Sequence, residues 1–257
     1  MSGQTIPDVL QNGLSRTRST QNDWYHHPAA FILQDNWSNK SRMVLQPSRL
    51  EPRRRGRPPK NQAALDAPRM RLIRTGVEIL TEKGFSAVGV DEMVTTAGVA
   101  KGSFYHYFDS KEAYGLALID AYADYYERRL DRCLGDSARE PLDRLAEFMA
   151  NARAGMARFG YRRGCLIGNL GQEMGVLPEP FRARLIAVLR DWEVRTETCL
   201  RAAQAAGTIP PDRDCRQLAQ FFWIGWEGAV LRAKLERRPD ALDAFSQTFM
   251  QLVQAPR

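Results

Sequence analysis

The chain has 257 residues, of which 44% are hydrophobic, enough for one or two folded domains with their own core. The absence of a bilayer-length apolar run and of a signal sequence predicts a cytoplasmic protein with no membrane partner. The net charge of +7 is concentrated in residues 1–60, where ten Lys or Arg face four acidic residues, and a clustered basic arm of this kind favours a nucleic-acid partner.

Residues 1–68 are rich in Ser, Asn, Gln, Arg and Pro and show no helical or strand periodicity, so we expect a disordered extension. From about Arg69 the pattern becomes helical, with apolar residues along one side and Gly84 as a left-handed cap. Four widely spaced cysteines show neither metal-ligand nor disulfide spacing, and we expect no metal and no cofactor.

The stretch from Val90 to Tyr107 has the spacing of a helix-turn-helix, with Gly98 allowing the left-handed turn. On its second helix, Phe104, Tyr107 and Phe108 share one side and are expected in the core. The outward groups then belong to Lys101, Ser103, Tyr105 and His106, which carry side chains able to bind phosphates or base edges. An ordinary helical hairpin with a polar surface is the alternative.

Further helices are expected at about 110–134, 141–159, 165–175, 179–206, 214–236 and 240–254, with no strand. Asp109 and Glu112 suggest a capping box at the first of them. The fold class is therefore all-α. We divide the chain into an extension at 1–68, a helix-turn-helix domain at 69–109 and a helical bundle at 110–257.

The segment from Leu72 to Leu118, and within it GSFYHYFDSKEAYGL, closely resembles the DNA-binding region of the TetR family of transcriptional regulators. It departs from the family pattern by Phe104 before Tyr105 and by Gly115, where a larger residue is common. The resemblance implies a homodimer on palindromic double-stranded DNA and a ligand-binding and dimerisation bundle. It also implies major-groove contacts from Lys101, Ser103, Tyr105 and His106 and a phosphate contact from Lys111.

The basic arm contains Arg55-Gly56-Arg57-Pro58, which looks like the core of an AT-hook. A glycine lets such a chain lie deep in a narrow minor groove, where the flanking Arg55 and Arg57 side chains meet its negative potential. An arginine-rich tail that binds DNA without sequence preference is the alternative, as is a protein that organises AT-rich DNA without a discrete operator.

The stretch GCLIGNLGQEMG places Cys165 near a helix N-terminus beside Arg162 and Arg163, an environment expected to lower a thiol pKa. A small buried cysteine that packs the turn is the alternative. Together with FWIGWEGA from Phe222, this stretch resembles a subgroup of the TetR family that responds to acrylate, from dimethylsulfoniopropionate breakdown, or to reactive aldehydes and quinones. The resemblance implies that Cys165 senses the effector and that acrylate or a related electrophile releases a repressor.

An acrylate-like effector needs apolar walls and either a thiol or a cation for recognition. The expected effector contacts are Cys165, Trp192, Phe222, Trp223, Trp226 and Arg232, although the aromatic residues fit a bundle core equally well. Gly225, Ala229 and Ala233 recur at every fourth position and suggest a dimer seam. An enzyme with Cys165 as nucleophile lacks a candidate base, because the three histidines are His26, His27 and His106.

Overall fold

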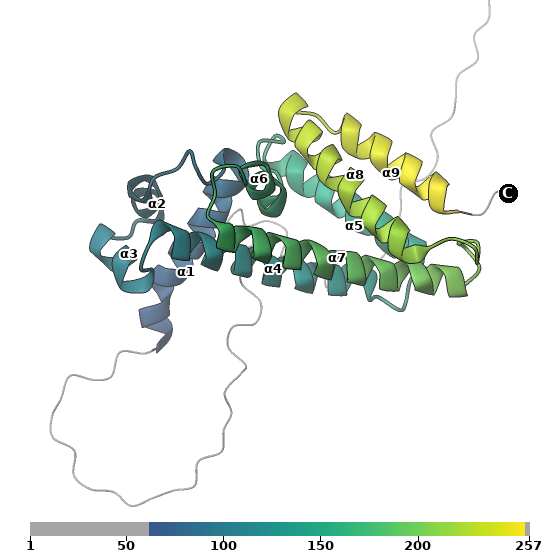
Figure 1. Ribbon diagram of the computed structural model, residues 1–257, viewed down its shortest axis with the longest axis horizontal. Coiled ribbons are helices and arrows are strands. Elements are labelled where there is room, and N and C mark those ends of the chain that lie inside the picture. The colour runs from purple at the N-terminus through teal and green to yellow at the C-terminus, as the bar shows by residue number, and fades with distance from the viewer. Residues whose placement is uncertain (1–61, 255–257) are drawn as a thin grey trace, which may run out of the picture. The chain divides into compact units, whose positions relative to one another are not determined.

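The computed structural model describes residues 62–254, and every regular element in that range is a helix (Figure 1). The elements are α1 (Gln62–Lys83), α2 (Val90–Ala97), α3 (Lys101–Tyr107), α4 (Lys111–Leu134), α5 (Pro141–Arg158), α6 (Leu166–Gln172), α7 (Glu179–Ala205), α8 (Cys215–Glu236) and α9 (Asp240–Val253). The predicted all-α class is confirmed. No helix among the described residues is both long and apolar enough to cross a membrane.

Helix α1 begins at Gln62, seven residues before the start expected at Arg69. The first turns of α1 could not be predicted because they are polar and contain Pro68. A proline inside a helix removes one backbone donor and normally marks a helix boundary. At the other end, Gly84 has φ of +83° and its N–H donates to the Leu80 carbonyl at 3.0 Å, which confirms the expected left-handed cap.

Helices α2 and α3 form the predicted helix-turn-helix. Gly98 has φ of 61° and ψ of 40°, a left-handed conformation that glycine adopts without strain. Val99 is buried in the corner, and Phe104 and Phe108 close the core of this unit. Tyr107, expected beside them, is only half-buried, because α3 ends there and its last turn lies at the edge of the core.

Helix α4 is capped by Ser110, whose hydroxyl accepts a hydrogen bond from the Ala113 N–H at 3.0 Å. The expected cap, Asp109, lies one residue too early, so Glu112 occupies N2 and the predicted capping box is wrong. Serine and aspartate are comparably good caps, and the sequence DSKE therefore left the choice of register open.

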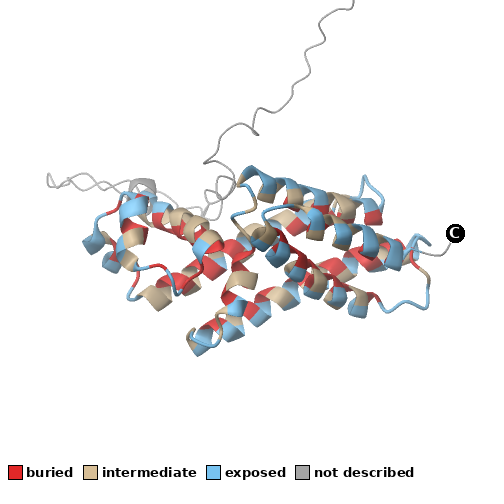
Figure 2. Ribbon diagram, turned by 90° about the horizontal axis from the view of Figure 1, so that it is seen from above, coloured by how far each residue is buried: buried red, intermediate tan, exposed pale blue. Residues whose placement is uncertain are grey.

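The bundle is formed by α4 to α9. Helix α7 packs against α4, α5 and α8, and α9 packs against α8 and α5. Figure 2 shows that the buried residues lie where these helices face one another and that the outer faces are exposed. Trp192 on α7 and Phe222 on α8 are among the fully buried side chains, so the centre of the bundle is aromatic.

The helix-turn-helix unit is bonded directly to the bundle through the start of α4. The Tyr114 hydroxyl donates to the Leu72 carbonyl of α1 at 2.5 Å, and the Tyr114 ring contacts Phe104 and Phe108 with centroids 5.2 and 4.8 Å away. A Cβ at Gly115 would lie within 2.6 Å of ring atoms of Phe85 and Phe181, which explains the glycine at this position. The start of α4 therefore contacts both α1 and α3 directly.

Candidate DNA-binding surface and effector site

The outward face of α3 carries the four predicted DNA contacts. Lys101, Tyr105 and His106 are exposed, Ser103 is half-buried, and 53% of the Tyr105 surface is accessible although its ring edge contacts Phe104. Buried Phe104 fixes the rotation of the helix, and the polar groups consequently face away from the core. This geometry presents an ammonium, a hydroxyl, a phenol and an imidazole on one short helix.

Lys101 has an anionic partner within the protein. Its Nζ lies 2.7 Å from Asp91 Oδ1 at the start of α2, and the hydrogen bond and charge of Asp91 raise the Lys101 pKa. The ammonium is fully charged at neutral pH and exposed. It can bind a phosphate only by leaving or sharing Asp91.

Lys111, the predicted phosphate contact, is turned toward the protein. Its Nζ donates to the Phe85 carbonyl at 2.8 Å and lies 4.3 Å from the centroid of the Phe85 ring. Burial lowers the Lys111 pKa. In this conformation Lys111 holds the loop between α1 and α2, and a phosphate contact stays a prediction. Arg55 and Arg57 of the basic arm lie outside the described residues.

The aromatic residues expected around an effector do come together. We define the aromatic cluster as Trp192, Phe222, Trp223 and Trp226 with two residues that the sequence had not singled out, Tyr126 and Phe148. Trp192 has ring centroids 4.9 Å from Tyr126 and 4.8 Å from Trp223, and Phe148 lies 5.9 Å from Trp223 and 6.2 Å from Trp226. The rings fill the centre of the bundle, as the core alternative also required.

Arg232 does not belong to this cluster, and its contact with the effector carboxylate stays a prediction. Its guanidinium is exposed and pairs with Glu236 on the same helix. Two helical turns correspond to about 7 residues. From Trp226 that step leads to buried Ala233, whereas Arg232 lies on the solvent side.

Cys165 is buried at the N-cap of α6, and its thiol pKa is raised well above the ordinary value by burial and by the nearby Glu227 carboxylate. The expected lowering of this pKa is therefore wrong. Arg162 and Arg163 lie close in the sequence, but they approach Glu82 at 3.4 Å and Glu78 at 3.5 Å on α1. The two arginines therefore neutralise glutamates of α1 and not the Cys165 thiolate. The surroundings of the thiol are apolar and include the Glu227 carboxylate.

Two polar side chains beside Cys165 were missed. Glu227 is half-buried on α8, and burial raises the pKa of its carboxyl to about 7. A Cβ at Gly168 would lie 2.1 Å from Glu227 Oε2, so the glycine on α6 makes room for this carboxylate. Tyr122 of α4 bonds the same thiol and is buried. The single acid in the apolar run FWIGWEGAV was the signal in the sequence.

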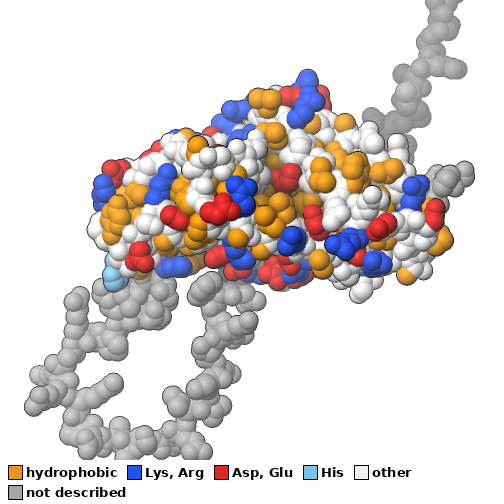
Figure 3. All heavy atoms as spheres, viewed as in Figure 1, with side chains coloured by type: hydrophobic (Ala, Val, Ile, Leu, Met, Phe, Trp, Pro, Cys, Tyr) orange, Lys and Arg blue, Asp and Glu red, His pale blue; other side chains and the backbone are white. Residues whose placement is uncertain are grey.

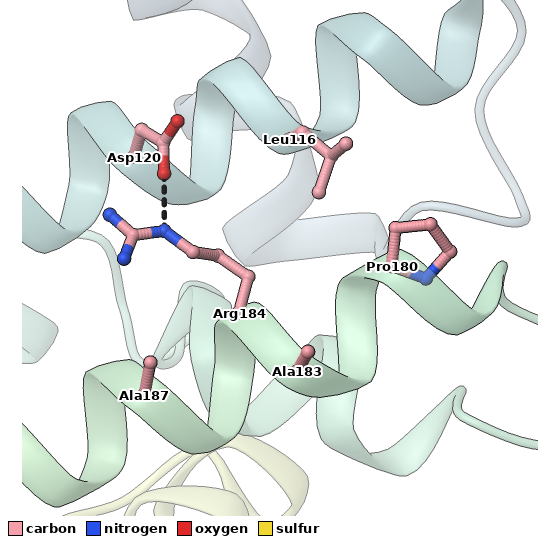
Figure 4. Close-up of a pocket in the computed structure, with 6 residues that line it drawn as sticks. All are labelled: Leu116, Asp120, Pro180, Ala183, Arg184 and Ala187. Carbon is pink, nitrogen blue, oxygen red and sulfur yellow. Dashed lines mark hydrogen bonds and ion pairs between the residues drawn. The ribbon is translucent and has the colours of Figure 1, made fainter.

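A separate hollow lies between α4 and α7 (Figure 4). It is lined by Leu116, Asp120, Pro180, Ala183, Arg184 and Ala187. Figure 4 shows the Arg184 guanidinium bonded to Asp120 across it. None of the predicted effector residues lines this hollow.

The small residues of α8 face their own chain rather than a dimer seam. A Cβ at Gly225 would lie 2.3 Å from the Phe245 ring of α9, and Ala229 and Ala233 are buried. The opposite side of α8 exposes an apolar stripe at heptad-like spacing, with 73% of Ile224 and 76% of Leu235 accessible. We define the α8 stripe as Phe221, Ile224, Gly228, Leu231 and Leu235. Figure 3 shows hydrophobic side chains exposed over α8 and α9.

Helix α6 connects the surroundings of Cys165 to the DNA-binding part. The Asn169 amide donates to the carbonyls of Leu80 and Thr81 at the end of α1, at 3.0 and 2.9 Å. The Glu173 carboxylate accepts hydrogen bonds from the N–H groups of Phe85 and Ser86. Helix α6 and the residue after it are therefore hydrogen-bonded to the end of α1 and to the loop before α2.

Two family models match the chain. Residues 72–115 match the model for bacterial regulatory proteins of the tetR family, and residues 141–249 match the tetracyclin repressor-like C-terminal domain. The transcriptional regulator AcuR of Cereibacter sphaeroides is 57% identical over 76% of this chain and 89% of its own length. The transcriptional repressor NemR of Escherichia coli is 30% identical over 68% of this chain and 88% of its own.

Solved structures agree with these similarities. A regulatory protein TetR from Rhodobacter sphaeroides superposes with a TM-score of 0.71 and 57% identity, covering 72% of this chain and 97% of that one. The reduced form of E. coli NemR gives a TM-score of 0.68 and 28% identity, covering 74% and 98%. The helix-turn-helix, the helical bundle and these relatives lead to one conclusion: the chain belongs to the TetR family of transcriptional regulators, which are not enzymes.

Proposed function

We propose that the protein is a homodimeric repressor that binds a palindromic operator with α3 in the major groove and leaves it when a small effector, acrylate or a related electrophile, enters the bundle. The observation that carries this proposal is the outward face of α3, where Lys101, Tyr105 and His106 are exposed beside a rigid aromatic core. A helix of this kind contacts base edges and phosphates of DNA. The proposed place of action is the cytoplasm.

The α8 stripe supports dimerisation. Its large apolar side chains are exposed along one side of a long helix, and contiguous exposed apolar surface marks an interaction site. A two-fold partner would cover the stripe with its own copy, because a two-fold interface brings the same surface together from both subunits.

The similarity to AcuR and the aromatic cluster support a small acrylate-like effector. Cys165 is buried and its pKa is raised, so little of the nucleophilic thiolate exists at neutral pH. This environment favours the alternative of a reversible ligand with a structural Cys165 over attack by the thiol. The effector changes operator affinity by its different affinity for the two bundle states.

Coupling to DNA has two supports in the contacts. Tyr114 on α4 bonds Leu72 of α1, and Asn169 and Glu173 on α6 and the loop after it hold the end of α1 and the following loop. An effector that displaces either helix moves α3 relative to its dimer mate and spoils the spacing of the two half-sites.

A footprint of the purified protein on its own upstream region, at fixed salt, tests the proposal. The expected result is a discrete protected palindrome that disappears with acrylate. Protection that survives acrylate would remove acrylate as effector, and diffuse coverage of AT-rich DNA would contradict an operator-specific repressor. Release of a Cys165→Ser protein by acrylate would establish the reversible alternative.

A further inference from the structure

Arg129 is a positive charge inside the bundle without a negative partner among the described residues. It lies on α4, is half-buried, and its guanidinium carbon lies 5.7 Å from the ring centroids of both Tyr126 and Phe148. Several other arginines of the bundle do pair with acids, as Arg153 does with Asp243 at 2.6 Å. A half-buried cation that contacts aromatic faces and pairs with no acid attracts an anion.

Trp192 provides a second and independent observation. Its side chain is 0% exposed, and its indole N–H has no hydrogen-bond partner in the described part of the chain. The neighbouring Trp223 differs, since its N–H donates to the Thr196 hydroxyl at 3.0 Å. A buried donor without an acceptor costs free energy, and such groups call for an explanation by a ligand or a bound water.

Both groups border the same rings. Tyr126 contacts both Arg129 and Trp192, and Phe148 contacts both Arg129 and Trp223. The two groups thus share aromatic surroundings that offer one cation and one donor without a partner in the described part of the chain. A small carboxylic acid with a short apolar body matches this combination, because its oxygens accept from both groups and its carbons contact the rings.

We propose that Arg129 and the Trp192 indole N–H hold the carboxylate of the effector inside the aromatic cluster. This inference rests on the proposed function, since it identifies the ligand chemistry of the same bundle. The carboxylate replaces the aromatic faces of Tyr126 and Phe148 as the partner of the guanidinium. Because these two rings belong to α4 and α5, the exchange shifts α4, whose first turn is bonded to α1 through Tyr114.

Carboxylate binding at this place needs no covalent step. Cys165 lies beside Tyr122, whereas Arg129 follows Tyr122 by seven residues, or about two turns, on the same face of α4. The saturated acid propionate therefore binds like acrylate, and the neutral amide acrylamide, which keeps the electrophilic double bond, does not.

Isothermal titration calorimetry of the full-length protein with acrylate, propionate and acrylamide tests the site. The variant Arg129→Gln is expected to bind both acids about 10- to 100-fold more weakly, the loss typical of a charge-assisted hydrogen-bond pair. The matched control is Arg128→Gln, which removes an exposed arginine next to it and is expected to leave acid binding unchanged. Circular dichroism verifies that each variant is folded.

Acid binding that is equal in folded Arg129→Gln and wild type, or wild-type binding of acrylamide as tight as that of acrylate, would overturn the site. So would the absence of acid binding to wild type. If Arg129→Gln does not fold, Arg129→Met decides, since it removes the charge and keeps a long unbranched side chain that packs against the rings. Unchanged acid affinity in that variant would overturn the proposal. Acids that bind through Arg129 while the operator stays protected would support the site and contradict the proposed repressor mechanism.

Discussion

Glu173 and Phe85 are bonded across 88 residues of sequence: the Glu173 Oε1 accepts the Phe85 N–H at 2.9 Å. The second oxygen accepts the Ser86 N–H at 2.7 Å. A single carboxylate on the loop after α6 thus satisfies two backbone donors just before the helix-turn-helix. This contact fixes the position of the DNA-binding part against the bundle.

Replacement of Glu173 by alanine leaves both N–H groups without their partner. We expect the free energy of unfolding to fall by about 1–2 kcal/mol, since water replaces part of the missing hydrogen bonding. Operator affinity is expected to fall as well. Urea unfolding and an operator titration measure the two effects. Glu179→Ala, which removes an exposed pair with Arg182, is the control and is expected to change neither.

Tyr105 offers a test of base contact. Tyr105→Phe removes only the phenolic hydroxyl, and we expect operator affinity to fall by about 1 kcal/mol while affinity for random DNA is unchanged. Fluorescence anisotropy with both DNAs measures the difference. Tyr125→Phe on α4 is the matched control. An equal loss on operator and random DNA would assign Tyr105 to the phosphate backbone instead.

The basic arm is tested by its salt dependence. The double variant Arg55→Ala with Arg57→Ala is expected to weaken operator binding and to reduce the slope of log affinity against log salt by about 0.9 for each phosphate that the arm no longer neutralises. Arg16→Ala with Arg18→Ala removes the same charge elsewhere in the extension. Identical slopes for the two double variants would contradict a specific role for Arg55 and Arg57.

The α8 stripe predicts the oligomeric state. Ile224→Glu introduces a charge into the proposed dimer face, and we expect a monomer because an unpaired charge in an apolar interface is strongly unfavourable. Sedimentation velocity measures the mass. Val194→Glu places the same charge on an apolar residue of α7 that is 60% exposed. A dimer in the Ile224 variant, or a monomer in both, would contradict the assignment.

Glu227 predicts a pH dependence of stability. Burial raises the pKa of the Glu227 carboxyl from 4.5 to about 7. Between these two pH values the folded state keeps a proton on Glu227 that the unfolded state has lost. The contribution of Glu227 to the free energy of unfolding is fully present below about pH 4.5. It is lost as the pH rises through about 7, and the free energy of unfolding falls by up to about 3 kcal/mol. Glu227→Gln stays neutral and is expected to lack this loss.

Urea unfolding between pH 4.5 and 8 compares Glu227→Gln with wild type. The variant is expected to gain relative stability as the pH rises, and the gain is expected to level off above about pH 7 to 8. Glu140→Gln, at the exposed and uncapped start of α5, is expected to follow wild type. A constant difference between Glu227→Gln and wild type across this range would show that Glu227 ionises normally.

Local signals predicted the fold well. Gly84 and Gly98 adopt the left-handed conformation that their positions required, and the side of α3 that carries Phe104 is buried as its spacing indicated. These features depend on neighbours in the sequence. The register of α4 failed by one residue, because Asp109 and Ser110 are both good caps.

The interior of the bundle was predicted less well, because long-range contacts decide it. Arg162 and Arg163 lie next to Cys165 in the sequence, yet Glu78 and Glu82 of α1 take their charges. Arg129 lies in a polar stretch of α4, and nothing in that stretch predicts its contact with the Phe148 ring on α5. Only the packing of distant helices shows that Arg129 contacts two rings and has no ion pair among residues 62–254.

The Lys101–Asp91 pair has a consequence for how the protein selects DNA. The Asp91 carboxylate on α2 lies 2.7 Å from the Lys101 ammonium. Because both belong to one chain, the effective concentration of this carboxylate at Lys101 is high. Asp91 thus acts as a built-in competitor that any polyanion must displace. We therefore expect loose encounters with random DNA to gain little from Lys101. We expect the lysine to leave Asp91 only where the other α3 side chains make enough contacts to hold the helix in the groove.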